Sequence, residues 1–315
     1  MCAIGRRRAL PIKPLPFTSL KFITYCTIMT SHNPFTDTID SPLGFYEIAS
    51  SAAKVAACSR NSIWTLDDQH QLHHRYFFLG SYAWESIPWT QPGTPQHIAA
   101  AGDGTVVVAT EDSLYQYTET GFVPLKRWGV PTSTIDALAV GGAQHIYYTA
   151  QFELYHYVGN EINTRFYLQT AEGAPVSGHF NAMAAADDGS LYVVVDATGY
   201  QVRPTCTPSW AAQATPDGIP YFNCAVAAGN QVYFHAMDVG IPGQTLPGLQ
   251  LLMGQQVPAA IDAHIVTPTN PKGTAFPSDS TLLDLEALED GTLLLVISNS
   301  SGSKLYINTY NDLNN

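Results

Sequence analysis

A pattern of two strands joined by a tight turn occurs six times along the chain. Each copy has a first strand of mostly small residues, a short turn rich in Gly, Asp or Asn, and a second strand of β-branched or aromatic residues. A period of about 40–45 residues with three or four strands per copy is typical of β-propellers. The spacings between successive copies are 43, 39, 45, 42 and 61 residues. The copies begin at Lys54, His97, Asp136, Asn181, Asn223 and Asp284.

The small residues in the first strands have a physical reason in such a fold. Innermost strands converge on the axis of a propeller, where large side chains would collide. Three residues after each opening residue stand Ala57, Ala100, Ala139, Ala184, Val226 and Ala287. The sequence therefore predicts an all-β, six-bladed propeller in which the six opening residues share one level of a central channel.

The two ends of the repeat region are expected to meet. The last copy leaves room for only three strands before Asn315, and "LGFYEIA", residues 43–49, is predicted to supply the fourth strand and close the ring. The long final spacing is assigned to residues 242–280, an outer-strand region with a long loop. Residues 1–40 are predicted to be a basic, disordered extension, and residues 41–315 a single propeller domain.

The first 28 residues contain five basic residues and no acidic residue. These residues are either a signal peptide or a disordered tail that precedes a start at Met29. Prolines and lysines interrupt the apolar stretch, which favours the tail. The chain has five cysteines and no CxxC pair, as expected for free thiols in an intracellular protein. A cytoplasmic location is therefore predicted, with secretion as the alternative.

Charge and motifs exclude several function classes. Residues 29–315 have 9 basic and 26 acidic residues, and such an acidic body repels phosphate backbones, so no nucleic-acid partner is expected. The sequence contains no run of about 18 apolar residues, so no membrane span is expected. The sequence contains neither a phosphate-binding loop nor a dinucleotide fingerprint, so no nucleotide cofactor is expected.

Two of the repeats resemble a known group of propellers. "NAMAAADDGSLYVV" and "DALAVGGAQHIYY" are similar to the innermost hairpins of the gluconolactonase, senescence-marker and strictosidine-synthase-like propellers. The resemblance implies six blades, an active site in the central channel and a divalent metal, Ca²⁺ or Mg²⁺, held by Asn, Asp and Glu. By position, Asn181, Asn223 and Asp284 match the ligands. The glycine that usually follows the Asn is replaced here by Ala182 and Cys224.

A second resemblance points to a different function class. "NSIWTLDDQHQLHH" and "AWESIP" resemble a tectonin-type lectin repeat, which implies a glycan partner and a sugar platform at Trp84. Four of the five tryptophans lie in the first half of the chain, whereas a multivalent lectin repeats its binding site. The histidines of "HQLHH" suggest zinc, but a solvated hairpin is the preferred interpretation because zinc needs three or four convergent ligands.

The opening residues differ from copy to copy, as a site for one asymmetric small molecule requires. Asp and Asn offer oxygen ligands to Ca²⁺ or Mg²⁺. The side chains of Lys54, His97 and Asp136 are candidate acids or bases, and His179 is expected at the channel mouth. Asn181 and Asn223 are expected to orient a substrate.

The sequence thus predicts a small-molecule-processing protein with its site in the central channel. The chemistry is either metal-assisted hydrolysis of a lactone or ester, or cofactor-independent cyclisation or addition on an apolar metabolite. A tectonin-like lectin and a protein-interaction scaffold remain as alternatives, because the fold does not choose among them.

Overall fold

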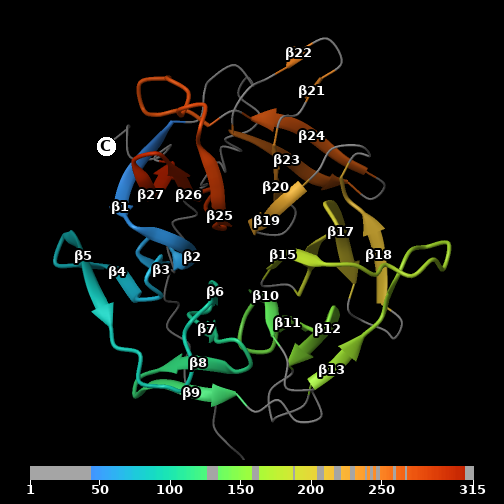
Figure 1. Ribbon diagram of the computed structural model, residues 1–315, viewed down its shortest axis with the longest axis horizontal. Helices are drawn as coiled ribbons and strands as arrows, with labels where there is room; N and C mark the ends of the chain where they lie inside the picture. Colours follow the sequence, from blue (N-terminus) through green and yellow to red (C-terminus); the bar gives the residue numbers. More distant parts are fainter. Residues whose placement is uncertain are drawn as a thin grey trace, which may run out of the picture. The chain divides into compact units, whose positions relative to one another are not determined.

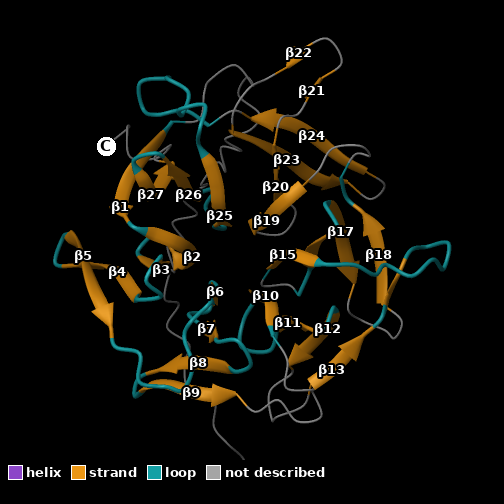
Figure 2. Ribbon diagram, in the orientation of Figure 1, coloured by secondary structure: helices purple, strands orange, loops and turns teal. Residues whose placement is uncertain are grey.

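The computed structural model describes residues 44–125, 134–157, 163–186, 189–203, 209–215, 221–227, 231–237, 240–241, 244–245, 249–257, 260–266 and 268–308. These residues belong to the second of two units into which the chain divides, Thr38–Asn315. They form strands, turns and loops without a helix (Figure 2). The predicted N-terminal extension, residues 1–40, lies outside the described residues.

The first three sheets each consist of four consecutive antiparallel strands. The first sheet contains β2 (Ala52–Ser59), β3 (Ser62–Asp67), β4 (Leu72–Phe78) and β5 (Ser81–Ile87). The second contains β6 (His97–Ala100), β7 (Val106–Ala109), β8 (Leu114–Thr118) and β9 (Gly121–Leu125). The third contains β10 (Ile135–Val140), β11 (Ile146–Ala150), β12 (Glu153–Tyr157) and β13 (Asn163–Phe166).

Three further sheets follow, and a two-stranded ribbon lies within the fifth repeat. The fourth sheet contains β15 (Phe180–Ala185), β16 (Leu191–Val195), β17 (Thr198–Arg203) and β18 (Ser209–Gln213), with β14 (Leu168–Gln169) parallel to β18. The fifth contains β19 (Tyr221–Ala227), β20 (Gln231–Met237), β23 (Leu249–Val257) and β24 (Ala260–Val266). The sixth contains β25 (Thr281–Ala287), β26 (Leu293–Asn299), β27 (Gly302–Asn308) and β1 (Phe45–Ser50), and the ribbon contains β21 (Gly240–Ile241) and β22 (Gln244–Thr245).

The first strand of every repeat is the innermost strand of its sheet. Figure 1 shows these strands nearest a common centre, with the other strands of each sheet farther out. Successive innermost strands lie beside one another, and the last returns to the first, so they enclose a channel. In ring order they are β2, β6, β10, β15, β19 and β25.

The two ends of the repeat region meet in the sixth sheet, as the sequence predicts. Strand β1 pairs antiparallel with β27, from Phe45 opposite Asn308 to Ser50 opposite Lys304. The Phe45 side chain is 1% exposed, and its backbone N–H donates to the Thr269 carbonyl at 2.8 Å. The N-terminal strand is therefore an integral part of the last sheet.

The hydrophobic core lies between the faces of neighbouring sheets. Each cluster of buried side chains that contains an innermost alanine also contains large residues from the second strands. Tyr147, Tyr192 and Tyr233, each at most 1% exposed, lie opposite Ala139, Ala184 and Ala225 across the first strand pair. Small residues near the axis and large residues one strand outward match the widening gap between radiating sheets.

Asp-Gly pairs close two of the innermost hairpins, where the sequence predicts short turns rich in Gly, Asp or Asn. Gly104 and Gly291 have φ values of +89° and +82°, which glycine adopts without strain. In both turns the aspartate before the glycine accepts a hydrogen bond from the backbone N–H two residues on, at 2.9 Å for Asp103 and 3.0 Å for Asp290. In the third such pair, only Gly189 falls within the described residues.

The register of the innermost strands differs in two repeats from the one that the repeat pattern predicts. When the innermost strands are aligned on their hairpin pairing, Ala137 and Ala182 are level with Lys54. The register of β15 shifts between Phe180 and Ala182, and that of β10 shifts between Ile135 and Leu138. The predicted common level is therefore wrong for Asp136 and Asn181, because each is one residue too early.

His235 on β20 provides a test of the packed interior by pH. Its side chain is 1% exposed, neither ring nitrogen has a partner among the described residues, and burial lowers its pKa to about 4. The unfolded chain, with an ordinary histidine pKa near 6.5, therefore binds more protons between pH 6.5 and pH 4. The free energy of unfolding is expected to fall as the pH is lowered through this window, by about 3 kcal/mol for this group.

Thermal melts of wild type and His235→Phe between pH 7 and pH 4 measure this effect. The variant cannot take up the proton, so its melting temperature should fall less steeply. His179→Phe serves as the control, because that side chain is exposed. Parallel pH profiles for wild type and His235→Phe would contradict the prediction.

Candidate functional site

Polar side chains gather on one side of the channel, at the level where the innermost strands begin. Four neighbouring strands, β19, β25, β2 and β6, contribute Asn223, Asp284, Lys54 and His97. The remaining two strands have alanine at this level. These four are among the six opening residues of the repeats; the other two, Asp136 and Asn181, lie one residue before this level.

Asp284 connects this group. Its Oδ2 accepts a hydrogen bond from the backbone N–H of Val55 at 2.9 Å. Its Oδ1 accepts a hydrogen bond from Asn223 Nδ2 at 3.1 Å and lies 3.9 Å from Lys54 Nζ. Its side chain is 15% exposed and that of Lys54 is 35% exposed, so the ammonium group reaches solvent while the carboxylate stays mostly covered.

His97 is neutral at physiological pH. Burial lowers its pKa to about 4, and the nearby charge of Lys54 acts in the same direction, while Asp284 opposes them. A neutral imidazole beside an ammonium group provides a proton acceptor and a proton donor of different kinds at one site. The arrangement is therefore capable of acid–base chemistry without an additional group.

The other predicted channel residues lie elsewhere. Asp136 and Asn181 occupy the bulges, and the Asn181 side chain is exposed. His179 precedes β15 and is also exposed; its backbone N–H donates to Asp196 Oδ1 at 2.8 Å, and its ring is 5.8 Å from that of Phe152. No described contact joins these three residues to the group around Asp284.

Trp84 is not a channel residue. It lies on β5, the outermost strand of the first sheet, opposite Arg75 on β4. Its side chain is 37% exposed, beside other exposed side chains of the same hairpin, including Phe77 and Tyr82. The guanidinium of Arg75 stacks 3.5 Å from the centre of the Tyr82 ring.

Two histidines of "HQLHH" have carboxylate partners on the first sheet. His73 Nε2 lies 3.1 Å from Asp67 Oδ2, and His74 Nδ1 lies 3.3 Å from Glu85 Oε1. Nowhere in the described part of the chain do three histidine, cysteine, aspartate or glutamate side chains gather as metal ligands. These histidines belong to the solvated hairpins of the first sheet, as the preferred interpretation expected.

Glu286 is a channel residue that the sequence analysis missed. It stands on β25 at a level where every other innermost strand has alanine. Burial raises its pKa to about 8, and the negative charge of Asp284 adds to the effect. The signal was present in the repeat: one copy has a carboxylate where five have a methyl group. The alanines at this level are Ala56, Ala99, Ala139, Ala184 and Ala225.

A cavity of about 340 Å³ opens at the hairpin-turn end of the channel. A second cavity of about 60 Å³ lies deeper and reaches Asn223 and Asp284. Glu286 lines both, so it stands where the wide mouth meets the narrow interior. The smaller space has room for about two water molecules, whereas the mouth has room for a small organic molecule.

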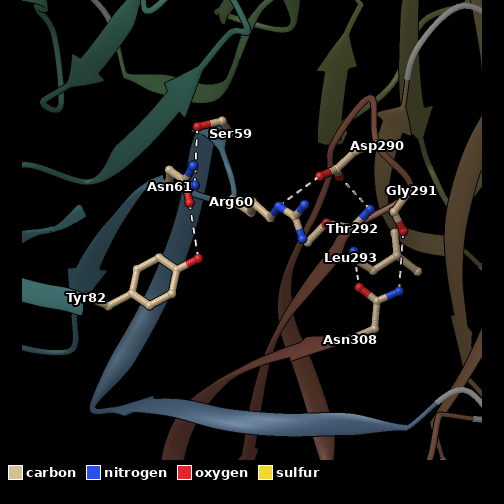
Figure 3. Close-up of polar contacts among 9 residues, drawn as sticks. All are labelled: Ser59, Arg60, Asn61, Tyr82, Asp290, Gly291, Thr292, Leu293 and Asn308. Atoms are coloured by element: carbon tan, nitrogen blue, oxygen red, sulfur yellow. Dashed lines mark hydrogen bonds and ion pairs between the residues drawn. The ribbon is translucent and has the colours of Figure 1, made fainter. Parts of the chain in front are cut away.

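The rim of this mouth is held by contacts between the first and last sheets. Arg60 and Asp290 point toward one another from the β2–β3 and β25–β26 turns, with Nε and Oδ2 3.6 Å apart (Figure 3). Asn308, at the end of β27, accepts a hydrogen bond from the Leu293 N–H at 2.6 Å and donates one to the Gly291 carbonyl at 3.3 Å. These contacts fix the turn that carries Asp290.

The two described cysteines are poor nucleophiles. Burial raises the pKa of the Cys58 thiol at the mouth to about 11, and burial also raises that of Cys224. Both are free thiols, as the sequence predicts. Because the thiolate is the reactive form, neither supports a covalent mechanism.

The donors around Asp284 do not fit a divalent cation. Both of its carboxylate oxygens already accept hydrogen bonds from protein groups, and the Asn223 Oδ1 accepts one from the Cys224 N–H at 2.9 Å. A divalent cation beside Asp284 would need further oxygen ligands, but the group next to this carboxylate is the ammonium of Lys54. Asn181, the third predicted ligand, is one residue out of the common level.

Comparisons with solved structures are in line with this architecture. A streptogramin B lyase matches 84% of this chain and 97% of its own with a TM-score of 0.54 at 9% identity. The fold is a β-propeller. A catalytically inactive virginiamycin B lyase from Staphylococcus aureus with quinupristin matches 86% of each chain with a TM-score of 0.50 at 12% identity.

Propellers with other roles match to a similar extent. YCF48 bound to a D1 peptide covers 84% of this chain and 79% of its own, with a TM-score of 0.50 and 15% identity. No protein-family model matches the chain, and no curated protein matches it either. At such low identity these likenesses establish the propeller fold and leave the function to the site. Among the described residues, no helix has the length and apolarity to cross a membrane.

Proposed function

We propose that this propeller, counted as six blades from its six large sheets, binds and converts a small molecule in its central channel. The observation that carries the proposal is the convergence of four unlike polar side chains, from four neighbouring strands, on one side of a channel otherwise lined mainly by small residues. A scaffold has no need for unlike groups at one level, whereas an asymmetric substrate does.

The chemistry that we infer is acid–base catalysis by the chain's own side chains. Lys54 donates a proton or a hydrogen bond, and neutral His97 accepts one. Asp284 positions both Lys54 and Asn223, and Asn223 orients the substrate. This set suits cofactor-independent addition, elimination or cyclisation better than metal-assisted hydrolysis, because the oxygen donors are already engaged.

Binding of glycans has weaker support. The exposed aromatic residues around Trp84 would suit a sugar ring, but among the described residues they gather on the hairpin of a single sheet. A multivalent lectin needs the same platform in several sheets. The peptide-bound propeller among the similar structures keeps an interaction role open as the third candidate.

Substitutions at the polar level are expected to reduce conversion strongly without unfolding the protein. Substrate is first found by incubating the purified protein with a metabolite extract and following losses by mass spectrometry. Lys54→Met and Asp284→Asn should then lower the rate about 100-fold, since a displaced catalytic or orienting group has a cost of that order. Lys304→Met is the matched control, because that lysine pairs with Glu47 on the outer strands.

Melting temperatures of all three variants are measured beside the rates. A loss of rate with preserved melting temperature assigns the effect to the site. Unchanged rates in both Lys54→Met and Asp284→Asn, or a wild type that neither binds nor converts any metabolite, would overturn the proposal.

A further inference from the structure

The mouth at the hairpin-turn end of the channel has one strong chemical asymmetry. Its wall is apolar and is built by one small residue from each innermost strand. Its floor is the carboxyl group of Glu286. The wall residues are Ala57, Ala100, Val140, Ala185, Val226 and Ala287.

The floor carboxyl group has little to stabilise its charge. Among the described residues, the hydrogen bond that it accepts comes from the N–H of Ala287, the next residue, to Oε1 at 3.1 Å. Burial raises the pKa of this group, and the negative charge of Asp284, two residues away, adds to the effect. A carboxylate in such a place is stabilised by an incoming cation that brings its own hydrogen-bond donors.

The rim adds to this preference. Glu289 and Asp290 also line the cavity, and its described lining includes no lysine or arginine; Arg60 lies beside it, against Asp290 (Figure 3). The field at the mouth is therefore negative, and it favours the approach of a positively charged molecule. Anions are repelled by the same groups.

We propose that the hairpin-turn mouth binds a small primary ammonium compound with an aliphatic body, with the ammonium on Glu286 and the body against the wall. This inference rests on the proposed function and specifies its substrate class as amines. The volume of about 340 Å³ accommodates a chain of several carbons, and the narrower cavity beyond leads toward Asn223 and Asp284. The charge selects the ligand, and the small side chains leave room for it.

Titration calorimetry at pH 8 with n-pentylamine, and with pentan-1-ol as the neutral control of similar shape, tests this inference. The amine should bind wild type more tightly than the alcohol. Glu286→Gln should weaken amine binding about tenfold or more, since a charged hydrogen bond is lost, and should leave the alcohol unaffected. Glu85→Gln, a carboxylate on the outer strand β5, should leave both unchanged.

A second variant locates the site independently of Glu286. Ala185→Leu places a larger side chain in the mouth and should abolish binding of the amine, with folding checked by melting temperature. Equal binding of amine and alcohol, an undiminished affinity in Glu286→Gln, or absence of amine binding by wild type would each overturn the inference. If the amine fails to bind while conversion still depends on Lys54 and Asp284, the channel function stands and its substrate is not an amine.

Discussion

A chain that begins at residue 51 is expected to lose most of its stability. The deletion removes β1, which forms the outer edge of the sixth sheet, and with it the fully buried Phe45. Removing a buried phenylalanine side chain alone costs about 3–5 kcal/mol, and the strand also takes its hydrogen bonds to β27. The total exceeds about 5 kcal/mol, which is comparable with the whole stability of many domains.

Thermal or denaturant unfolding of two truncated proteins measures this effect. Deletion of residues 1–28 should leave the melting temperature unchanged, whereas deletion of residues 1–50 should lower it by more than 10 °C or abolish the cooperative transition, at about 2–4 °C per kcal/mol for a domain of this size. Phe45→Ala in the full chain gives an intermediate loss and keeps the test valid if the longer deletion does not fold. Equal stability of the two truncated proteins would contradict the role of β1.

Gly141→Ala is expected to destabilise the protein by about 3 kcal/mol, because it overpacks a contact between two backbones. Gly141 lies in the β10–β11 turn, and a Cβ atom there would overlap the carbonyl oxygen of Ala186 in the next sheet. That carbonyl cannot move freely, because it accepts the hydrogen bond from Gly189 that closes its own turn at 2.9 Å. The third and fourth sheets would have to separate at their inner turns.

Gly104→Ala is the matched control for this contact. It lies in the equivalent turn of the second sheet, and a Cβ atom there would have no neighbour within 4 Å. Its positive φ makes alanine unfavourable by about 1 kcal/mol, so the control reports backbone strain without the clash. A melting temperature for Gly141→Ala as high as that of Gly104→Ala would show that the sheets tolerate the extra atom.

Much of the fold follows from one repeated pattern. Alternation of apolar residues with Asp-Gly turns is enough to predict the innermost hairpins, since both signals are local. Counting strands also predicts the closing strand, which is β1. It predicts outer strands and a long loop in residues 242–280, where the structure has β23, β24 and the 268–280 loop.

The site was harder to predict, because it depends on register across six strands. Bulges lie just before this level in β2, β19 and β25 as well, but only in β10 and β15 is the bulge residue polar, so an alignment on polar residues placed Asp136 and Asn181 at the wrong level. An alignment on the turns instead puts Ala137 and Ala182 there. In the other four strands the residue at the level itself is polar, so the same alignment placed these four together.

Glu286 was missed for a different reason. The prediction rests on the polar residue at the start of each strand, whereas the signal for Glu286, five alanines and one glutamate at one level, lies in the middle of the strand. Burial of a carboxyl group at an alanine position has an energetic cost that a purely structural strand avoids. An odd residue within a repeat is therefore a useful signal of function.

The pairing of β1 with β27 joins the first and last parts of the propeller to be synthesised. While the ribosome is still making the chain, β1 has no partner, and its open edge is free to pair with other polypeptides. A chain that stops before β27 retains that edge permanently. Ring closure therefore distinguishes a finished propeller from an unfinished one by whether the β1 edge is covered.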